Sequence, residues 1–368
     1  MKTDLICSAC DREYSAGPDE PWRCDCGQPL DFAEQPLPDA DQPPDFCEID
    51  TRDGLWAFEE FLPVRRVVSL GEGFTPLTDA DEWNTQFKLD CVFPSGSFKD
   101  RGATATLSRA AELGVETVLE DSSGNAGAAI AQYAARAGID AEIYVPADVK
   151  KSKLTAIERA GATPVRVEGT RQDVTDACID AVEAGDGWYA SHAWNPAFFA
   201  GTMTFALELA AQRDWSMPDA VVSPLGHGTL FLGMYRGFKA LLDAGWTDEM
   251  PRLLGVQAEG VAPIASELQG DGDTDSDEKN DVADGIQITQ PVRSNQIVDA
   301  IEKTGGDAIA LDAETTQEAL DKLHRTGFYV EPTSAVAVAG LSAYRERGTL
   351  AEDADVVVPL TGSGLKSS

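Results

Sequence analysis

Residues 95–102 read SGSFKDRG, and this stretch decides how the rest of the chain is interpreted. It places Lys99 in a loop of small residues directly before residues 103–113, whose apolar positions recur at helical spacing up to Gly114. A lysine at a helix start meets the positive end of the helix dipole, and partial burial also disfavours its charge. Both effects favour the neutral amine of Lys99, which is the form that makes a Schiff base. The ordinary alternative is a helix lysine that extends to solvent.

Length and charge set the class of protein. A chain of 368 residues with 43% hydrophobic residues predicts two globular lobes and a small additional segment. Its 29 Lys and Arg residues against 63 Asp and Glu residues give a net charge of −34, which excludes nucleic acid and anionic membrane surfaces as expected partners. The acidic residues are spread along the sequence, which favours a cytoplasm of high ionic strength that screens their repulsion.

Two further segments bear on location and surface. The sequence has no secretion signal and no apolar run near the roughly twenty residues that span a bilayer, so we expect a cytoplasmic protein. Residues 270–285 are polar and acidic and predict a surface loop.

Four of the seven cysteines lie near the start of the chain: Cys7, Cys10, Cys24 and Cys26. An odd total and this clustering favour metal binding or reduced thiols over disulfides. Two cysteine pairs on hairpin turns predict a zinc-ribbon-like segment over residues 1–32, because so short a segment needs a staple to fold. The second pair is C-x-C instead of C-x-x-C, so a degenerate ribbon that has lost its ion is an open alternative. Residues 33–50, rich in Pro, Asp and Gln, predict a linker.

Short apolar runs alternate with helical patterns after Val115, which predicts a parallel α/β sheet. The expected strands and helices are 116–120, 128–137, 141–145, 151–160, 163–167 and 172–184. The first strand ends at the loop Ser122-Ser123-Gly124-Asn125, and loops at strand carboxyl ends bind ligands in such sheets. A capped turn without a ligand is the alternative, since Ser and Asn are common helix caps.

A second loop of this kind follows the expected strand 220–224. Gly226-His227-Gly228-Thr229 leads into a helical pattern that begins at Leu230. Unpaired backbone N–H groups converge at such a turn, which makes it a candidate anion site, although an ordinary strand-to-helix turn has the same form. Near the end of the chain, the expected strand 356–360 leads into TGSGLK at residues 361–366.

SGSFKDRG, SSGN and TGSGLK together resemble motifs of the fold-type II pyridoxal-phosphate enzymes, most closely those of threonine synthases. The resemblance implies an α/β fold with two three-layer α/β/α lobes and an N-terminal zinc-ribbon-like knuckle. It places a large cofactor-binding lobe at 33–105 and 196–368 and a smaller substrate-side lobe at 106–195. It also implies a homodimer that acts on a small amino acid. With the acidity, it predicts an origin in a halophilic archaeon.

The resemblance also assigns site residues. It implies that Lys99 carries the cofactor as a Schiff base and that Asn125 meets the cofactor's phenolic oxygen. The expected contacts of the substrate carboxylate are Ser122, Ser123 and Gly124. The expected contacts of the cofactor phosphate are Gly226, His227, Gly228 and Thr229. Thr361 is expected at the pyridine nitrogen, where a neutral hydroxyl favours elimination and replacement.

The sequence departs from the threonine synthase pattern where the substrate phosphate should bind. Phe198 and Met203 occupy the positions at which those enzymes carry an arginine and a lysine. His192, His227 or Arg293 could supply positive charge instead.

Three functions therefore stay open. The first is a threonine synthase, which converts O-phosphohomoserine and water to threonine and phosphate. The second is a threonine or serine dehydratase, or another eliminating or β-replacing enzyme such as a cysteate synthase. The third is a regulatory protein that carries pyridoxal phosphate without turnover.

Overall fold

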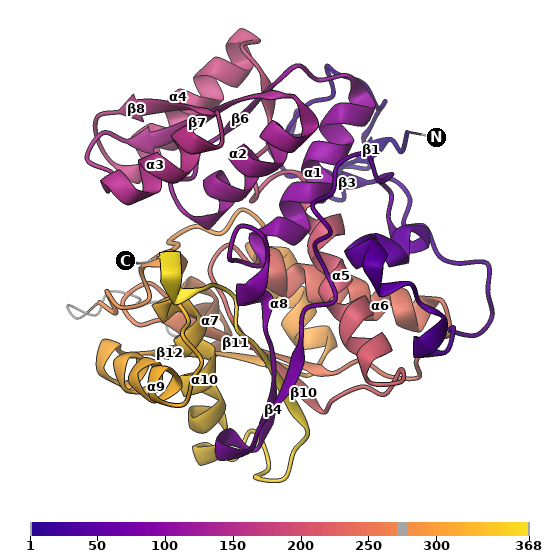
Figure 1. Ribbon diagram of the computed structural model, residues 1–368, viewed down its shortest axis with the longest axis vertical. Coiled ribbons are helices and arrows are strands. Elements are labelled where there is room, and N and C mark those ends of the chain that lie inside the picture. Colours follow the sequence, from indigo (N-terminus) through magenta and orange to yellow (C-terminus); the bar gives the residue numbers. More distant parts are fainter. Residues whose placement is uncertain (1, 271–278, 367–368) are drawn as a thin grey trace. The chain divides into compact units, whose positions relative to one another are not determined.

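The computed structural model describes residues 2–270 and 279–366 (Figure 1). Residues 271–278 of the predicted acidic surface loop lie outside the described residues. The chain forms two compact units, which we call unit 1 and unit 2. Unit 1 comprises Met1–Asp39, Asp50–Gly73 and Lys99–Thr204, and unit 2 comprises Ala40–Ile49, Phe74–Phe98 and Phe205–Ser368.

Unit 1 contains a four-stranded parallel sheet in the order β8-β7-β6-β9. Its strands are β6 (Thr117–Glu120), β7 (Asp140–Pro146), β8 (Thr163–Val167) and β9 (Trp188–Tyr189). Its helices are α1 (Lys99–Leu113), α2 (Asn125–Ala137), α3 (Lys151–Arg159) and α4 (Arg171–Ala184). Leu107 of α1, Ile130 of α2 and Ile143 of β7 are buried in one apolar cluster. Helices that cover a parallel sheet bury its strands, which explains their short runs of apolar residues.

The N-terminal part of unit 1 is a small antiparallel sheet in the order β2-β1-β3. Its strands are β1 (Leu5–Ile6), β2 (Glu13–Tyr14) and β3 (Asp31–Phe32). Its apolar cluster contains only four fully buried residues, Leu5, Cys7, Cys24 and Leu30. A cluster of this size is a poor core, so the segment depends on other contacts. The η2 segment (Thr51–Phe61) follows in the same unit.

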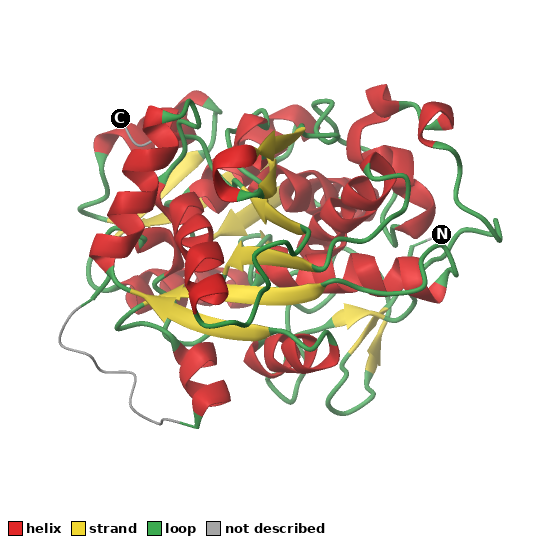
Figure 2. Ribbon diagram, turned by 90° about the horizontal axis from the view of Figure 1, so that it is seen from below, coloured by secondary structure: helices red, strands yellow, loops and turns green. Residues whose placement is uncertain are grey.

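Unit 2 contains a six-stranded sheet in the order β12-β11-β10-β13-β5-β4. All neighbouring strands are parallel except the edge strand β4, which is antiparallel to β5. The strands are β4 (Leu77–Ala80), β5 (Thr85–Lys88), β10 (Ala220–Pro224), β11 (Arg252–Ala258), β12 (Asp307–Leu311) and β13 (Val356–Pro359). Figure 2 shows the strands in yellow with helices packed against them.

The helices of unit 2 are α6 (Thr229–Asp243), α7 (Pro263–Gln269), α8 (Ser294–Lys303), α9 (Ala313–Arg325) and α10 (Pro332–Glu346). Short 3-10 turns are η1 (Phe46–Glu48), η3 (Asp81–Trp83), η4 (Asp90–Val92), η5 (Asp284–Ile286) and η6 (Gly364–Lys366). Helix α5 (Pro196–Gln212) crosses from unit 1 to unit 2 between Thr204 and Phe205. Among the described residues, no helix has both the length and the apolar character needed to cross a bilayer.

The predicted α/β class and the parallel strand pairing are confirmed. Helix α2 begins at Asn125, three residues before the predicted start, because the small residues at its first turn continue the helix. The boundaries of the two compact units differ from those of the predicted lobes, since residues 50–73, 99–105 and 196–204 belong to unit 1. The packing explains why: a Cβ on Gly201 would lie 1.9 Å from the carbonyl oxygen of Arg101, so α5 and α1 approach each other closely there.

Candidate functional site

Lys99 is the first residue of α1, so the helix begins four residues before the predicted stretch 103–113 and includes the lysine that the sequence analysis placed in the preceding loop. Its Nζ atom lies 5.6 Å from the centroid of the Phe198 ring. The ring packs against the first turn of α1 at Gly102, where an added Cβ would lie 2.3 Å from two ring carbons. Glycine is therefore the residue that lets Phe198 lie this close to the helix that carries Lys99.

The loop between β6 and α2 contains the predicted carboxylate-binding residues. Ser122, Ser123, Gly124 and Asn125 are all half-buried. The backbone N–H of Gly124 donates to Ser122 Oγ at 3.2 Å. A Cβ on Gly127 would lie 1.8 Å from the Ser122 carbonyl oxygen, so the loop folds back on the first turn of α2. Backbone N–H groups at this helix N-terminus favour an anion such as a carboxylate.

Glu120, the last residue of β6, pairs with His192. His192 Nδ1 lies 2.8 Å from Glu120 Oε1, and the His192 backbone N–H donates to Glu120 Oε2 at 3.3 Å. The pairing of β9 with β6 brings the two residues together, since the chain after β9 runs beside the end of β6. Burial raises the pKa of Glu120 well above its usual range, with Asp121 adding to the rise and Lys99 opposing it. Sequence spacing gave no signal for this pair, whose members are 72 residues apart.

The two positions that depart from the threonine synthase pattern are part of the interior. Phe198 is 0% exposed and Met203 is 1% exposed. The Phe198 ring also meets the His192 ring edge-on, with 5.9 Å between the ring centroids. Apolar packing has thus replaced the two expected basic groups.

The predicted phosphate turn lies in unit 2, where β10 leads into α6. Gly228 has a φ of +73°, and a Cβ there would lie 2.5 Å from Ile297 Cδ1. Gly226 is also enclosed, with Ile286 Cα 3.2 Å from an added Cβ. His227 between them is half-buried, and Thr229 begins the helix. The turn has the small residues and the helix N-terminus that an anion site requires.

Thr361 also lies in unit 2, just after β13. Its hydroxyl lies 3.1 Å from Ser334 Oγ, which in turn accepts a hydrogen bond from the Gly362 N–H at 3.0 Å. Both hydroxyls are buried. The hydroxyl of Ser334 thus fixes Thr361, a contact that the sequence motif did not reveal.

The structure accordingly groups the predicted residues within each unit. In unit 1, Lys99 lies beside Phe198, and Phe198 lies beside the His192–Glu120 pair. The 122–125 loop begins two residues after Glu120. In unit 2, Thr361 contacts Ser334.

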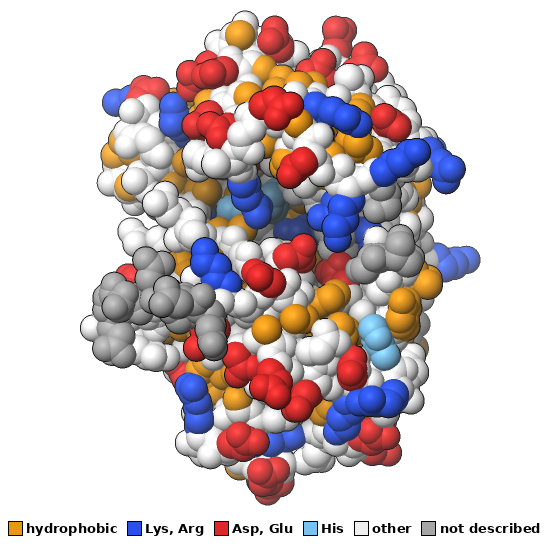
Figure 3. Space-filling model, turned by 90° about the vertical axis from the view of Figure 1, so that its left-hand side faces the viewer, with side chains coloured by type: hydrophobic (Ala, Val, Ile, Leu, Met, Phe, Trp, Pro, Cys, Tyr) orange, Lys and Arg blue, Asp and Glu red, His pale blue; other side chains and the backbone are white. Residues whose placement is uncertain are grey.

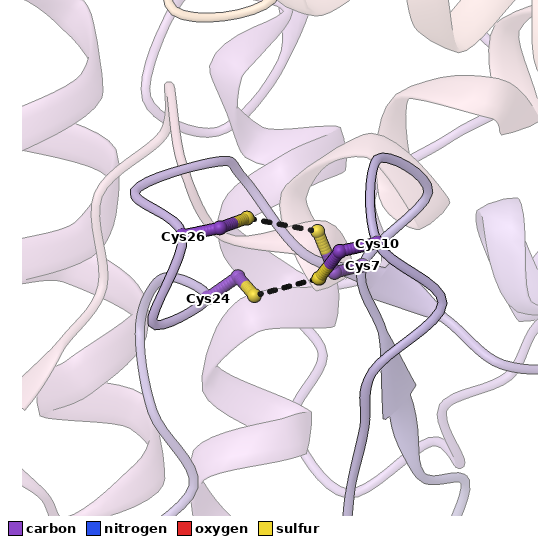
Figure 4. A group of neighbouring side chains, drawn as sticks. All are labelled: Cys7, Cys10, Cys24 and Cys26. Atoms are coloured by element: carbon purple, nitrogen blue, oxygen red, sulfur yellow. Dashed lines mark hydrogen bonds between the residues drawn. The ribbon is translucent and has the colours of Figure 1, made fainter.

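The four N-terminal cysteines form a cluster (Figure 4). All four sulfurs lie within 4.8 Å of one another, with Cys7 to Cys26 at 3.6 Å and Cys10 to Cys24 at 3.5 Å. A zinc ion about 2.3 Å from each of four tetrahedral sulfurs requires sulfur–sulfur distances of roughly 3.8 Å. The C-x-C spacing therefore does not prevent a tetrahedral set. The Cys26 backbone N–H and the Tyr14 hydroxyl lower the pKa of Cys24 to about 6, and the hydrogen bonds of Cys24 raise the pKa values of Cys10 and Cys26.

The cysteine segment packs on α1 and on the chain after β9. Arg109 of α1 donates through Nη2 to Glu20 Oε2 at 2.6 Å and to the Thr3 carbonyl at 2.8 Å. Trp22 meets the rings of Tyr189 and Trp194 edge-on, at centroid distances of 5.3 Å and 4.8 Å. The segment is thus joined to the helix that begins at Lys99.

Comparison with known proteins identifies the family. A family model described as pyridoxal-phosphate dependent enzyme matches residues 68–362. The chain is 35% identical over 327 residues to the threonine synthase of Methanocaldococcus jannaschii, covering 85% of this chain and 80% of that protein. It is 34% identical over 324 residues to the threonine synthase of Methanosarcina acetivorans, again covering 85% and 80%.

Two solved structures show the same fold. Maize serine racemase superimposes with a TM-score of 0.70 at 21% identity, covering 87% of this chain and 93% of that one. The processed form of threonine deaminase isoform 2 from Solanum lycopersicum superimposes with a TM-score of 0.67 at 21% identity, covering 89% of this chain and 87% of that one.

Proposed function

The chain belongs to the pyridoxal-phosphate dependent enzyme family and is a pyridoxal-phosphate-dependent lyase, and we propose that it converts O-phosphohomoserine and water to threonine and phosphate. One observation carries the proposal: relatives named threonine synthase, 29% to 35% identical, each match about 85% of the chain. The predicted regulatory protein without turnover is set aside, because the relatives are enzymes.

The predicted residues would hold the cofactor and the substrate between them. Lys99 would hold the cofactor, and its amine would take a proton from the substrate carbon. The hydroxyls and N–H groups of residues 122–124 bind the substrate carboxylate. Bound pyridoxal phosphate supplies the electron sink for the carbon that loses its proton.

Three further contacts with the cofactor follow from the same assignment. The turn Gly226–Thr229 binds its phosphate, because the backbone N–H groups at the start of α6 favour an anion. Asn125 would meet its phenolic oxygen. Thr361, whose hydroxyl lies 3.1 Å from Ser334 Oγ, would meet its pyridine nitrogen.

The test is phosphate release and threonine formation from O-phosphohomoserine, with purified protein loaded with pyridoxal phosphate in high salt. We expect the two products in equal amounts. A protein that shows the visible absorbance of lysine-bound cofactor but releases no phosphate would contradict the proposed substrate.

The burial of Phe198 and Met203 favours a second candidate, a dehydratase that acts on threonine or serine or a related β-replacing enzyme. A dianionic phosphate loses two positive partners at these positions, whereas a leaving hydroxyl needs neither. Formation of 2-oxobutanoate and ammonia from threonine would identify the dehydratase.

We further propose that Cys7, Cys10, Cys24 and Cys26 bind one zinc ion, which staples the N-terminal segment. The sulfur distances and the small apolar cluster of the segment support this. We expect about one zinc per chain in wild type and in Cys47→Ser, an exposed cysteine outside the cluster, and much less in Cys24→Ser. Equal zinc in all three proteins would contradict the site.

Two proposals concern the conditions of action and the assembly. Figure 3 shows Asp and Glu side chains spread over the drawn face, in keeping with the net charge of −34. We propose that the enzyme works in a salt-rich cytoplasm, where screening lowers this repulsion. Activity that peaks in dilute buffer would contradict this.

We also propose a homodimer, which light scattering of the purified protein tests.

A further inference from the structure

The His192–Glu120 pair has a fixed orientation. Glu120 uses one carboxyl oxygen for the His192 ring and the other for the His192 backbone N–H. The Glu120 carboxyl group, which makes the hydrogen bond at Nδ1, fixes the orientation of the imidazole ring. Nε2 then lies on the side of the ring away from Glu120, where it is the nitrogen able to give or take a proton.

The pair lies close to the reactive lysine. The Phe198 ring contacts both sides: its centroid is 5.9 Å from that of His192 and 5.6 Å from Lys99 Nζ. Glu120 also lies two residues before the loop proposed to hold the substrate carboxylate. The imidazole is thus one aromatic ring away from Lys99, within the same compact unit.

Several charged groups lie near the pair. Glu120 is influenced by Asp121, Lys99 and Arg171. Asp121 is held by the hydroxyls of Thr175 at 2.6 Å and Tyr189 at 2.9 Å. Lys99 is already assigned to the cofactor and to the substrate carbon. Phe198 and Met203 supply no proton at the positions where the relatives' pattern predicts basic groups.

We propose that His192, held by Glu120, donates a proton to the oxygen that leaves the substrate side chain. The proposal rests on the proposed function and applies to a phosphate ester oxygen or a hydroxyl. A proton leaves the carbon next to the one that bears the oxygen, and a carbon–carbon double bond forms. The carbon–oxygen bond breaks, the oxygen keeps the electron pair, and it takes the proton from Nε2. Solvent returns a proton to His192 after the leaving group departs.

A leaving group that needs no proton separates this role from a structural one. β-Chloroalanine loses chloride, which leaves as a stable anion without protonation. The experiment compares wild type, His192→Asn, Glu120→Gln and the control His324→Asn. His324 lies in α9 of unit 2, where its Nε2 contacts the Val330 carbonyl oxygen at 2.9 Å. The measured quantities are kcat and KM for O-phosphohomoserine, threonine and β-chloroalanine, with phosphate, 2-oxobutanoate and pyruvate as the products.

We expect His192→Asn to lower kcat for the oxygen substrate by about 10²- to 10⁴-fold, the usual contribution of a general acid. Its kcat for β-chloroalanine should stay within a few-fold of wild type. Glu120→Gln should lower kcat for the oxygen substrate less and shift its dependence on pH, because it keeps a hydrogen bond at Nδ1 but cannot titrate. His324→Asn should match wild type with every substrate.

The outcomes distinguish this proposal from the proposed function. Which oxygen substrate the wild type consumes tells the phosphate ester from the hydroxyl. An active wild type with an unchanged His192→Asn, or with equal losses for oxygen and chloride, overturns the role of His192 alone. A wild type that binds pyridoxal phosphate and consumes none of the three substrates overturns both. Thermal unfolding of each variant is measured alongside, and Glu120→Gln provides the test should His192→Asn fail to fold.

Discussion

The two ends of α1 are held in place by different forces. At the first turn, shape decides: Phe198 packs on Gly102 with no room for a Cβ. At the third turn, charge decides: the side chains of Arg109 and Glu20 form an ion pair that is 1% and 4% exposed. The N-terminal end of α1, which carries Lys99 and which we call the reactive end, is thus positioned by close packing. The part around Arg109, which we call the distal end, is positioned by a buried ion pair with the cysteine segment. Substitutions at the two ends should therefore change stability for different reasons.

The largest expected effect is that of Lys99→Ala, which removes the chemistry at the reactive end and leaves its packing. We expect loss of the visible absorbance of lysine-bound cofactor and a fall in turnover of about 10⁴-fold or more, since one group serves as both cofactor anchor and base. The exposed Lys153→Ala in α3 is the matched control. If Lys99→Ala kept its turnover, Lys99 would not be a catalytic residue.

Arg109→Met tests the distal end. It leaves Glu20 buried without its partner, which should lower the free energy of unfolding by about 3–5 kcal/mol. The double variant Arg109→Met with Glu20→Leu should recover most of this loss, because both charges are then gone. Urea unfolding followed by circular dichroism measures both. A single variant within about 0.5 kcal/mol of wild type, the range of ordinary surface changes, would show that the pair does not hold this end.

Gly102→Ala tests the reactive end. Helix propensity alone would make the alanine more stable by about 1 kcal/mol. Because its Cβ would lie 2.3 Å from the Phe198 ring, we expect instead a loss of about 1–3 kcal/mol from overpacking. Phe198→Leu in the same chain should reduce the loss, so a double-mutant cycle gives a favourable coupling. Stabilisation by Gly102→Ala would mean that the Phe198 ring can move away and that close packing does not position the N-terminal end of α1.

The sequence predicted the features that depend on local pattern. The body of helix α1 over residues 103–113, the parallel strands and the cysteine cluster follow from periodicity, turn residues and spacing. These rest on residues that are close in sequence or on a repeated pattern, so one chain suffices to find them.

The contacts that define the candidate site were not predictable in the same way. His192 and Glu120 are 72 residues apart, and Ser334 and Thr361 are 27 apart. Each pair forms because separate strands or helices end side by side, and no pattern in either segment marks its partner. The burial of Phe198 also depends on two glycines in different helices, Gly102 and Gly201. These contacts therefore depend on long-range packing, which the sequence motifs alone do not reveal.

The smallest expected effect concerns the pH dependence of the distal end. Burial raises the pKa of Glu20, against the opposing influence of Arg109. The folded protein therefore binds a proton at Glu20 more tightly than the unfolded chain, whose glutamate pKa is about 4.3. The contribution of this group to stability is full below that pH and is lost as the pH rises through the higher pKa of the folded state.

Glu20→Gln removes this titration and so isolates it. Urea unfolding of wild type and variant from about pH 4 upward should show the wild type losing stability relative to the variant as the pH rises. Such a slope would mean that burial outweighs the ion pair at the distal end of α1. A wild type that instead gains stability with rising pH would show that Arg109 dominates and lowers the pKa of Glu20. In that case charge attraction holds this end even more strongly than burial opposes it, and the contrast with the shape-determined end at Gly102 becomes sharper.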